Sequence, residues 1–458
     1  MSKNGLSAAL AKMRDAGVAP QAINVFSHYY GELERGATGL VPEETIEPLR
    51  QVASVDDVEV SEHDARQALG RTVLIRLNGG LGTSMGLERA KTLLPVRDGR
   101  TFLDLLVAQV MAARARYDVT LPLVLMNSFR TRQDTLAALA AYPDLEVEGL
   151  PLDFVQNQEP KLRADDLTPV TWDADPALEW CPPGHGDIYT ALVSSGVLDA
   201  LLERGYRYAM TANADNLGAA PSARIAGWFA ATGAPYAPEV CRRTPADVKG
   251  GHLAVRKSDG RIILRDTAQT PEDQMHYFTD QFRHPFFHTN NLWFDLKVLR
   301  DTLADRGGIL GLPLIRNSKT VDPADSSSTP VIQLETAMGA AVEAFEGATA
   351  IEVPRSRFLP VKTTNDLLLV RSDVYEVDDD GLLQMVPDQA CTVSLDPRFY
   401  KKIQDFEARF PNGVPSIKDA QSLTVEGDWT FGADVVATGE AHVEAGGSPG
   451  RIADGTRI

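Results

Sequence analysis

A glycine-rich segment followed by a lysine is the part of this sequence whose chemistry is easiest to read. Residues 78–86 read NGGLGTSMG, with four glycines, and Lys91 follows. Glycine tolerates positive φ and lets a ligand approach the main chain, so successive N–H groups can face an anion. A cationic side chain just beyond such a loop can fold over bound phosphate. The spacing therefore indicates a phosphate-binding loop, with a tight surface turn as the alternative.

The loop departs from the two glycine motifs most often linked to nucleotides. No Lys-Ser or Lys-Thr pair follows its last glycine, so it is not a P-loop, and it does not match G-x-G-x-x-G. A glycine-rich loop alone is a weak signal. Its meaning depends on the other polar residues that the fold brings to it.

A glutamine and a histidine are the next candidates for ligand contact. Gln156 follows the strand-like run 150–155, and its amide offers an acceptor and a donor that match N3–H and O4 of uracil. His185 stands in Pro-Pro-Gly-His-Gly-Asp just before a helical pattern, where free amides and the helix dipole favour an anion. The simpler interpretations are a solvated loop residue and a structural turn residue.

Asp215 is the candidate metal ligand. It follows the strand-like run 207–211 in the string Asn-Ala-Asp-Asn-Leu-Gly, residues 213–218. Mg²⁺ takes one or two carboxylates and completes its shell with phosphate oxygens and water. An Asx turn that caps the strand is the equally weighted alternative.

Three later segments offer groups suited to a sugar. Gly250-Gly251 permits close approach of the main chain, and Asn290-Asn291 offers amides for hydroxyl groups. Glu335 adds a carboxylate that can accept hydroxyl protons. Turns and helix caps explain each of them about as well.

The elements that must position these residues predict an α/β fold. Strand-like runs at 72–77, 121–126, 150–155 and 207–211 alternate with helical patterns, as in a doubly wound sheet. Ligands of open α/β sheets collect beyond the carboxyl ends of the strands. The polar groups that follow these runs are therefore expected to share one site.

Several of these strings together resemble the eukaryotic-type UTP–glucose-1-phosphate uridylyltransferase (UDP-glucose pyrophosphorylase) family. The resemblance covers roughly residues 70–458 and is carried by LNGGLGTSMG with Lys91-Thr92, by PPGHGD at 182–187, by N-x-D-N-L-G at 213–218 and by VPRSRFLPVKTTNDLLLVRSD at 353–373. One string is easily matched by chance, whereas many in the family's order are not. The family implies a Rossmann-like, GT-A-like nucleotidyltransferase domain.

The resemblance also implies roles for individual residues. Lys91 and Lys362 are the implied catalytic cations, 271 residues apart (362 − 91), and Asp215 is the implied Mg²⁺ ligand. The implied nucleotide contacts are Leu77, Asn78, Gly79, Gly80, Gln156 and Gly184. The implied sugar-phosphate contacts are His185, Asn213, Gly251, Asn291 and Glu335. The sequence FVQNQEPK departs from the family's FNQSRYPR, so Gln158 stays an alternative to Gln156 as the base-reading residue.

The reaction implied by the resemblance joins UTP and α-D-glucose 1-phosphate to give UDP-glucose and pyrophosphate, with Mg²⁺ as cofactor. Two alternatives remain open. One is a pyrophosphorylase that accepts several UDP-sugars or an N-acetylhexosamine, although those relatives tend to carry an LAGGQGTRLG-like loop. The other is a UDP-sugar sensor without catalysis, which the intact Lys91, Asp215 and Lys362 disfavour. Sequence does not resolve glucose from galactose.

Three domains are predicted along the chain. Residues 1–70 read as a helical extension packed on the core, residues 71–375 as the catalytic domain, and residues 376–458 as a linker and C-terminal domain. Short alternating runs broken by glycine turns in the tail suit stacked rungs, and the family implies a left-handed β-helix. The open edge of a short solenoid invites pairing, so a homo-oligomer is a hypothesis.

Composition limits the partners. The 458 residues hold 45 Lys plus Arg against 63 Asp plus Glu, a net charge of −18, which disfavours nucleic acid. No apolar run approaches the ~18 residues of a membrane span. Three widely spaced cysteines fit a reducing compartment, so we expect a cytoplasmic protein.

Overall fold

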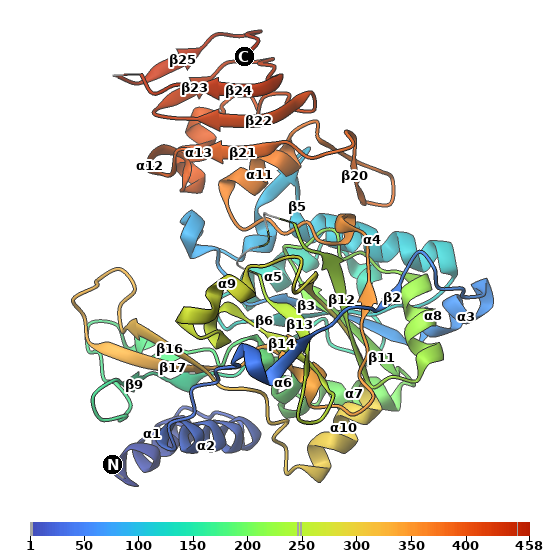
Figure 1. Cartoon of the computed structure of the whole chain (residues 1–458), viewed down its shortest axis with the longest axis vertical. Coiled ribbons are helices and arrows are strands. Elements are labelled where there is room, and N and C mark those ends of the chain that lie inside the picture. Colours follow the sequence, from blue (N-terminus) through green and yellow to red (C-terminus); the bar gives the residue numbers. More distant parts are fainter. Residues whose placement is uncertain (1–2, 245–246, 248–249, 447) are drawn as a thin grey trace.

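The computed structural model describes residues 3–244, 247, 250–446 and 448–458. Within them, an eleven-stranded mixed sheet forms the centre of the molecule (Figure 1). In spatial order its main path is β2 (Ala53–Ser54), β18 (Ile351–Glu352), β12 (Tyr236–Arg242), β15 (Phe286–Asp295), β11 (Tyr208–Asn213), β3 (Thr72–Asn78), β6 (Leu123–Asn127) and β7 (Asp153–Val155). Three further strands, β1 (Ile46–Pro48), β13 (His252–Arg256) and β14 (Ile262–Arg265), branch from β15.

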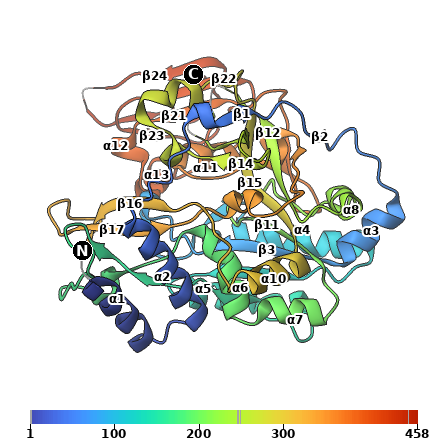
Figure 2. The same ribbon diagram turned by 60° about the horizontal axis from the view of Figure 1, so that its bottom comes forward.

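The central strands are mostly apolar and buried along nearly their whole length because helices cover both faces of the sheet. Val73 and Ile75 of β3 pack with α6 (Ile188–Ser194), α7 (Val197–Glu203) and α10 (Leu296–Asp305), which Figure 2 shows side by side. Leu74 packs on the opposite face with α3 (Glu62–Gly70), α4 (Phe102–Tyr117), α5 (Arg132–Leu139) and α8 (Ala223–Thr232). The α/β class is therefore confirmed.

The sheet differs in one respect from the purely doubly wound pattern. β11, β3, β6 and β7 are parallel, but β15 runs antiparallel between β11 and β12. The expected strand bounds also shift. Pro122 and Pro151 precede β6 and β7 and cannot donate to a strand ladder, so these strands begin later than the runs 121–126 and 150–155.

The N-terminal segment is only partly the helical extension that its pattern predicts. Helices α1 (Lys3–Asp15) and α2 (Pro20–Glu34) pack against β9 (Leu162–Arg163) and β17 (Pro330–Glu335) and not against the central sheet (Figure 1). β9 and β17 form a small antiparallel sheet with β16 (Ile315–Thr320). Residues 46–54 instead supply β1 and β2 to the central sheet, where β1 pairs with β13 and β2 with β18.

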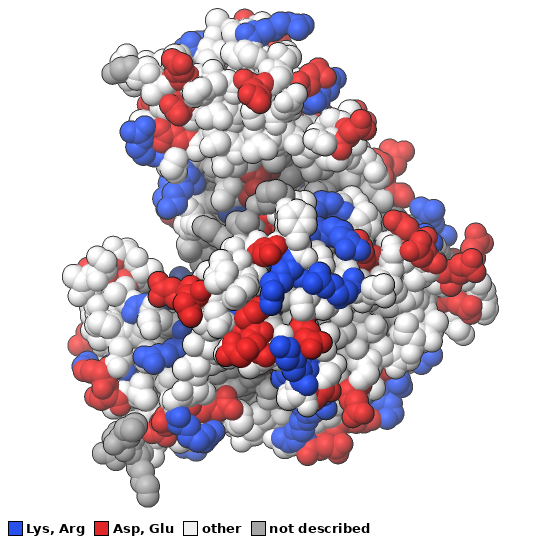
Figure 3. Space-filling model, viewed as in Figure 1, with Lys and Arg blue, Asp and Glu red and all other residues white. Residues whose placement is uncertain are grey.

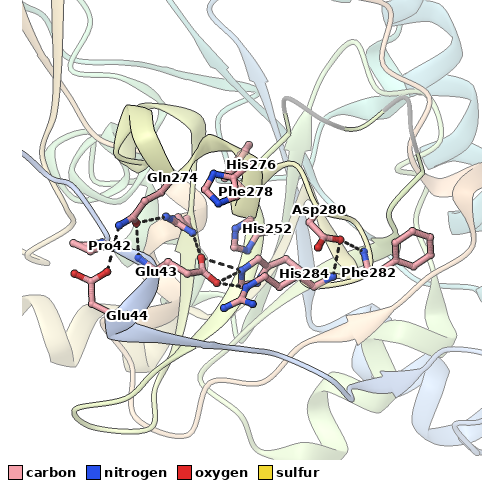
Figure 4. A network of polar contacts seen from close by, with 12 residues as sticks. Pro42, Glu43, Glu44, His252, Gln274, His276, Phe278, Asp280, Phe282 and His284 are labelled. Carbon is pink, nitrogen blue, oxygen red and sulfur yellow. Dashed lines mark hydrogen bonds and ion pairs between the residues drawn. The ribbon is translucent and has the colours of Figure 1, made fainter.

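A buried polar cluster around Glu43 fixes the chain just before β1. Glu43 lies in a short 3₁₀ turn, Glu43–Thr45, and accepts hydrogen bonds from Arg265 (2.5 Å), Arg283 and His284 (Figure 4). The His284 ring stacks on His252 with 3.9 Å between centroids. Burial alone would raise the pKa of Glu43, but hydrogen bonds and charge from Arg283, His284 and Arg265 lower it overall.

The C-terminal unit consists of stacked parallel strands. β21 (Thr392–Leu395), β22 (Ala420–Val425) and β24 (Gly439–Val443) form one side, β23 (Trp429–Phe431) and β25 (Gly450–Ile452) another, and parallel bridges join residues 416, 436 and 457. α11 (Thr364–Arg371) shares the apolar core of this unit, so the expected boundary at residue 375 cuts through a packed cluster.

Helix α4 joins the two units. Its Leu103 and Val107 pack in the core under the central sheet, whereas Leu105 and Leu106 pack in the C-terminal core. That second core also contains Met85 of the glycine-rich segment. The loop that is expected to bind phosphate therefore lies at the junction of the two units.

Candidate active site

An open cavity of about 340 Å³ lies at the carboxyl ends of β3, β6, β7 and β11. It collects most residues that the sequence assigned to a ligand. Its lining is Leu77, Asn78, Gly79, Gly80, Lys91, Thr92, Met126, Gln156, Pro182, Gly184, His185, Asn213, Ala214 and Asp215. Parallel strands whose ends meet at one sheet edge bring these distant segments together.

The glycine-rich loop owes its path to two glycines in the left-handed region, Gly82 (φ 68°) and Gly86 (φ 73°). The main-chain N–H of Lys91 donates to Gly80 O (3.3 Å), which returns the chain to the cavity. Gly79 is required for a different reason: a Cβ there would lie 2.9 Å from Gln156 Oε1. The glycine-rich loop and the Gln156 side chain therefore lie in contact on one side of the cavity.

Asn78 holds the loop to the sheet through its side chain. Its amide donates to Asn127 Oδ1 (2.7 Å) and Thr135 Oγ1 (2.9 Å), and its oxygen accepts from Thr92 Oγ1 (2.7 Å). The side chain is thus engaged within the protein. A direct contact of Asn78 with a nucleotide would have to come from its main chain.

Lys91 and Asp215 form an ion pair inside the cavity. The ammonium group donates to Asp215 Oδ2 at 2.6 Å and also to the carbonyl of Val361. Both side chains are mostly buried, at 14% and 19% exposed. The pair therefore joins the end of β11 to the segment that carries Lys362.

Lys362 lies at the start of α11, just outside the residues that line the cavity. Its main-chain N–H donates to Asp366 Oδ2 (2.8 Å) beside the capping box of Thr363 and Asp366. Its side chain is exposed. An antiparallel bridge between Asn216 and Pro360 holds this segment against the end of β11. Two lysines far apart in sequence thus border one aspartate.

Gly184 and His185 form the wall opposite the glycine loop. Gly184 has φ 79°, and a Cβ there would lie 2.6 Å from Thr336 O, so no other residue fits without strain. His185 Nδ1 accepts the main-chain N–H of Met338 (3.0 Å), which leaves the ring proton on Nε2. Part of His185 stays accessible from the cavity, but desolvation by the surrounding protein lowers its pKa, so the neutral ring offers a hydrogen-bond donor and not a charge.

The structure separates the two neighbouring asparagines. Asn290, at φ 66°, donates to Asn213 Oδ1 at 3.4 Å, next to the cavity. Asn291 is fully buried and donates to Glu239 Oε2 (3.0 Å) and to the carbonyl of Arg357 (3.1 Å). Asn290 is therefore better placed for a sugar than Asn291, whose amide is committed below the site.

Two other predicted sugar contacts lie outside the cavity lining. The carbonyl of Gly251 accepts the main-chain N–H of His288 (2.9 Å). Glu335 ends β17, and its Cβ lies 3.0 Å from the place where a Cβ of Gly184 would stand. Glu335 therefore borders the wall of Gly184 and His185, whereas Gly251 directly precedes β13.

A buried ion pair beneath the site was not found from the sequence. Glu239 of β12 is 0% exposed and accepts hydrogen bonds from Nε and Nη2 of the Arg357 guanidinium (2.7 and 2.8 Å). Asn216 then accepts the main-chain N–H of Leu359 (2.8 Å) and donates to Arg357 O (3.1 Å). A glutamate inside an apolar strand was the available signal, because a buried carboxylate needs a partner.

The described residues contain no group of three or more His, Cys, Asp or Glu side chains arranged to hold a metal ion. Asp215 is the carboxylate of the cavity, and its neighbours are amides and a lysine. One carboxylate is too few protein ligands to coordinate a metal ion without other molecules. It fits Mg²⁺, which uses one or two carboxylates together with phosphate oxygens and water.

A glycine loop, a lysine–aspartate pair and a glutamine amide at the ends of parallel strands define an α/β protein that binds nucleotide phosphates. Residues 23–437 match the model of a family described as UTP--glucose-1-phosphate uridylyltransferase. The chain belongs to this family.

Named relatives agree with that assignment. The UTP--glucose-1-phosphate uridylyltransferase of Solanum tuberosum is 40% identical, over 83% of this chain and 78% of the relative. The Saccharomyces cerevisiae enzyme of the same name is 40% identical, over 81% and 73%. A UDP-glucose pyrophosphorylase mutant of Leishmania major, solved in complex with UDP-glucose, is 43% identical with a TM-score of 0.92 and covers 100% of this chain and 98% of its own.

Proposed function

We propose that this protein catalyses the reversible reaction of UTP with α-D-glucose 1-phosphate to UDP-glucose and pyrophosphate. The observation that carries the proposal is the cavity in which Lys91, Asp215 and Gln156 meet the glycine loop. Family membership and the UDP-glucose bound to the Leishmania major relative support the same substrate class.

The proposed chemistry is an in-line attack of the sugar phosphate on the α-phosphorus of UTP. The bond from the glucose 1-phosphate oxygen to that phosphorus forms while the bond to the departing pyrophosphate breaks. Both reactants are anions, so positioning and charge stabilisation supply most of the catalysis, and no protein nucleophile is required. Lys91 and Lys362 approach the phosphates from the two segments joined at Asp215 and Val361.

We further propose Mg²⁺ as cofactor, with Asp215 as its protein ligand. When bound, the ion neutralises charge on the phosphates. The Lys91 ammonium group now faces Asp215 Oδ2, so bound phosphates give it a second anionic partner. Turnover is expected to disappear with EDTA and to return when Mg²⁺ is added, and turnover that persists in EDTA would contradict this cofactor.

Uracil is proposed to lie between the glycine loop and the wall of Gly184. Gln156 is favoured over Gln158 as the base-reading residue because Gln156 lines the cavity together with Gly79 and Gly184, whereas Gln158 lines other pockets. The amide of Gln156 presents the donor and acceptor that uracil needs.

A panel of sugar 1-phosphates tests the proposal. Purified protein with UTP and Mg²⁺ is expected to release pyrophosphate with glucose 1-phosphate and much less with N-acetylglucosamine 1-phosphate, and the galactose 1-phosphate arm measures the choice between the two hexoses. Equal rates across the panel would favour a broad UDP-sugar pyrophosphorylase. Binding of UDP-glucose with no exchange of labelled pyrophosphate into UTP would instead identify a sensor.

We also propose a compartment and an oligomeric state for this protein. The described residues contain no helix long and apolar enough to cross a membrane, and all three cysteines are buried and free. These features are compatible with a cytoplasmic protein. We propose that the C-terminal rungs form a left-handed β-helix whose open edge pairs with a second copy, and light scattering of a monomer at micromolar concentration would contradict that pairing.

A further inference from the structure

Asp187 carries a buried carboxylate that has no part in the proposed chemistry. It stands directly before α6 and is 5% exposed. Aspartate at this position commonly caps a helix, but here the side chain bonds elsewhere. Oδ2 accepts the main-chain N–H of Asn157 at 2.6 Å, and Oδ1 accepts its Nδ2 at 2.8 Å. Both oxygens thus hold one residue.

The residue that Asp187 holds follows the proposed base reader. The main-chain N–H of Gln156 donates to Asn127 O of β6 (2.8 Å), so Gln156 is fixed on one side by the sheet. Asp187 fixes it on the other side through Asn157. The side chain of Gln156 then lies against Gly79, where even an added methyl group would be too close.

Asp187 also belongs to the opposite wall of the cavity. It ends the 3₁₀ turn His185–Asp187, and Gly186 N in that turn donates to Thr336 O (2.8 Å). The turn begins at Gly184, which lines the cavity. One carboxylate therefore ties the strand-end loop of Gln156 to the wall of Gly184 and His185.

We propose that Asp187 is a positioning residue for nucleobase recognition, which sets the place of the Gln156 amide relative to Gly184 through its two hydrogen bonds to Asn157. The inference rests on the proposed function, because it assumes that uracil is read in this cavity. It goes beyond that function by naming the residue on which the choice of base depends.

The carboxyl group of Asp187 is mainly ionised at neutral pH, and it therefore accepts hydrogen bonds. Glu159 of β8 (Glu159–Pro160), Tyr29 of α2 and Tyr189 of α6 line the small cavity beside it. Burial raises the pKa of Asp187 to about 6, and the bonds from Asn157 oppose that rise. Burial and then the charge of Asp187 raise the pKa of Glu159 well above its ordinary value, so Glu159 stays neutral and leaves the negative charge on Asp187.

The test measures nucleotide selectivity in full-length Asp187→Asn. An amide at position 187 removes the negative charge that both donors of Asn157 face, and it keeps only one acceptor oxygen. Losing a hydrogen bond to a charged group predicts a KM for UTP higher by about 10- to 100-fold with kcat little changed. The ratio of kcat/KM for UTP to that for CTP should fall as well, because the lost contacts are those of uracil. UDP binding measured by calorimetry should weaken in parallel.

Two further variants separate positioning from general damage. The double exchange Asp187→Asn with Asn157→Asp restores a donor–acceptor match at both bonds, and it should recover most of the UTP affinity and selectivity. Asp295→Asn is the matched control. Asp295 is 6% exposed, and its carboxylate accepts from Val298 N (2.9 Å) at the start of α10. It lies beside the start of β11, whereas the cavity lies at the end of β11. It should leave the UTP to CTP ratio unchanged.

The outcomes are distinguishable from failure of the proposed function. If the unaltered protein turns over UTP and glucose 1-phosphate but Asp187→Asn keeps its KM and its UTP to CTP ratio, only the inference is wrong. The same holds if the variant loses kcat alone, or if the double exchange fails to recover selectivity. If the unaltered protein neither turns over nor binds uridine nucleotides, the proposed function fails and the inference with it.

Discussion

At the scale of single residues, the proposed role of each side chain in the cavity follows from its contacts and not from its residue type alone. Lys91 is one of many lysines, and its meaning comes from the 2.6 Å contact with Asp215 and from the carbonyl of Val361. Both partners hold the ammonium group at the place where phosphate charge is expected. Preorganised charges of this kind lower a barrier without reorganising during the reaction.

Lys362→Ala should lower kcat by ~10²–10³-fold, the usual cost of removing one preorganised group at a charged transition state. The side chain is exposed, so the melting temperature should stay the same. Initial rates with saturating UTP and glucose 1-phosphate check this, with the exposed Lys418→Ala as control. Near-normal turnover would show that Lys362 has no catalytic part.

Gly184→Ala should weaken UTP binding and destabilise the fold. The left-handed φ of 79° costs an alanine about 1–2 kcal/mol, and the added Cβ would also press on Thr336 O at 2.6 Å. Gly260→Ala is the matched control, because Gly260 has φ 71° with open space around it. The prediction is wrong if both variants lose the same stability and neither changes the KM for UTP.

At the scale of elements, the segment from Arg357 to Lys362 depends on the sheet behind it. Glu239 of β12 binds Arg357, and Asn216 at the end of β11 binds Leu359. Lys362 follows at once and opens α11, which packs in the C-terminal core. The lysine that we propose as catalytic therefore lies where the chain leaves the central sheet, next to a segment held by a buried ion pair.

Glu239→Gln should cost about 3–5 kcal/mol of stability, because the Arg357 guanidinium is left without its charged partner in the interior. It should also lower kcat and speed amide hydrogen exchange in residues 357–362, since their anchor is weakened. Urea unfolding, initial rates and exchange mass spectrometry measure these effects. Glu440→Gln, at an exposed site in β24, is expected to change none of them. Normal exchange with normal kcat would contradict the anchoring role.

At the scale of the whole molecule, the protein is strongly acidic, with a net charge of −18. Acidic and basic side chains are interspersed over the face shown in Figure 3. The net charge repels anionic substrates at long range, so their binding depends on the local cations of the cavity. Three buried histidines make the stability of this acidic protein sensitive to pH in addition.

Stability should fall as the pH is lowered from 7 to 5. Burial lowers the pKa values of His252 and His284, and it lowers that of His288 to about 3. Between the unfolded pKa near 6.5 and the lower folded pKa, the unfolded chain takes up protons that the folded chain refuses, so each histidine costs up to about 1.4 kcal/mol per pH unit. The raised pKa values of Asp187 and Glu159 offset part of this loss, but the histidines outnumber them. Urea unfolding at both pH values measures the loss. A stability that holds or rises toward pH 5 would contradict it, and the exposed His63→Gln should keep the same slope.

The α/β class and most of the cavity were predictable from residue patterns. Apolar runs buried on both faces, such as residues 72–77, read as strands because helices cover both sides of the sheet. Gly79, Gln156 and Asp215 follow such runs, and strand ends converge at one edge, whereas Gly184 was assigned through the family resemblance of PPGHGD. A short stretch of sequence is enough to recognise such strands and their ends.

Other features escaped prediction because they depend on partners distant in the chain. β15 runs antiparallel to its neighbours β11 and β12, but its apolar sequence is compatible with either strand direction. Asn290 and Asn291 look alike in sequence, yet one faces Asn213 and the other is locked to Glu239. Residues 46–54 pair with strands some 200 and 300 positions away.

The sequence by itself determined which groups are available: a glycine loop, two lysines, an aspartate, and amides at strand ends, all of which follow from residue type and short-range spacing. Only the tertiary structure decided which of them meet. Lys91, Asp215 and Val361 come together because a bridge at Asn216 and Pro360 closes the chain over more than a hundred residues. Side-chain packing and buried charge make that choice, and neither is encoded within one stretch of sequence.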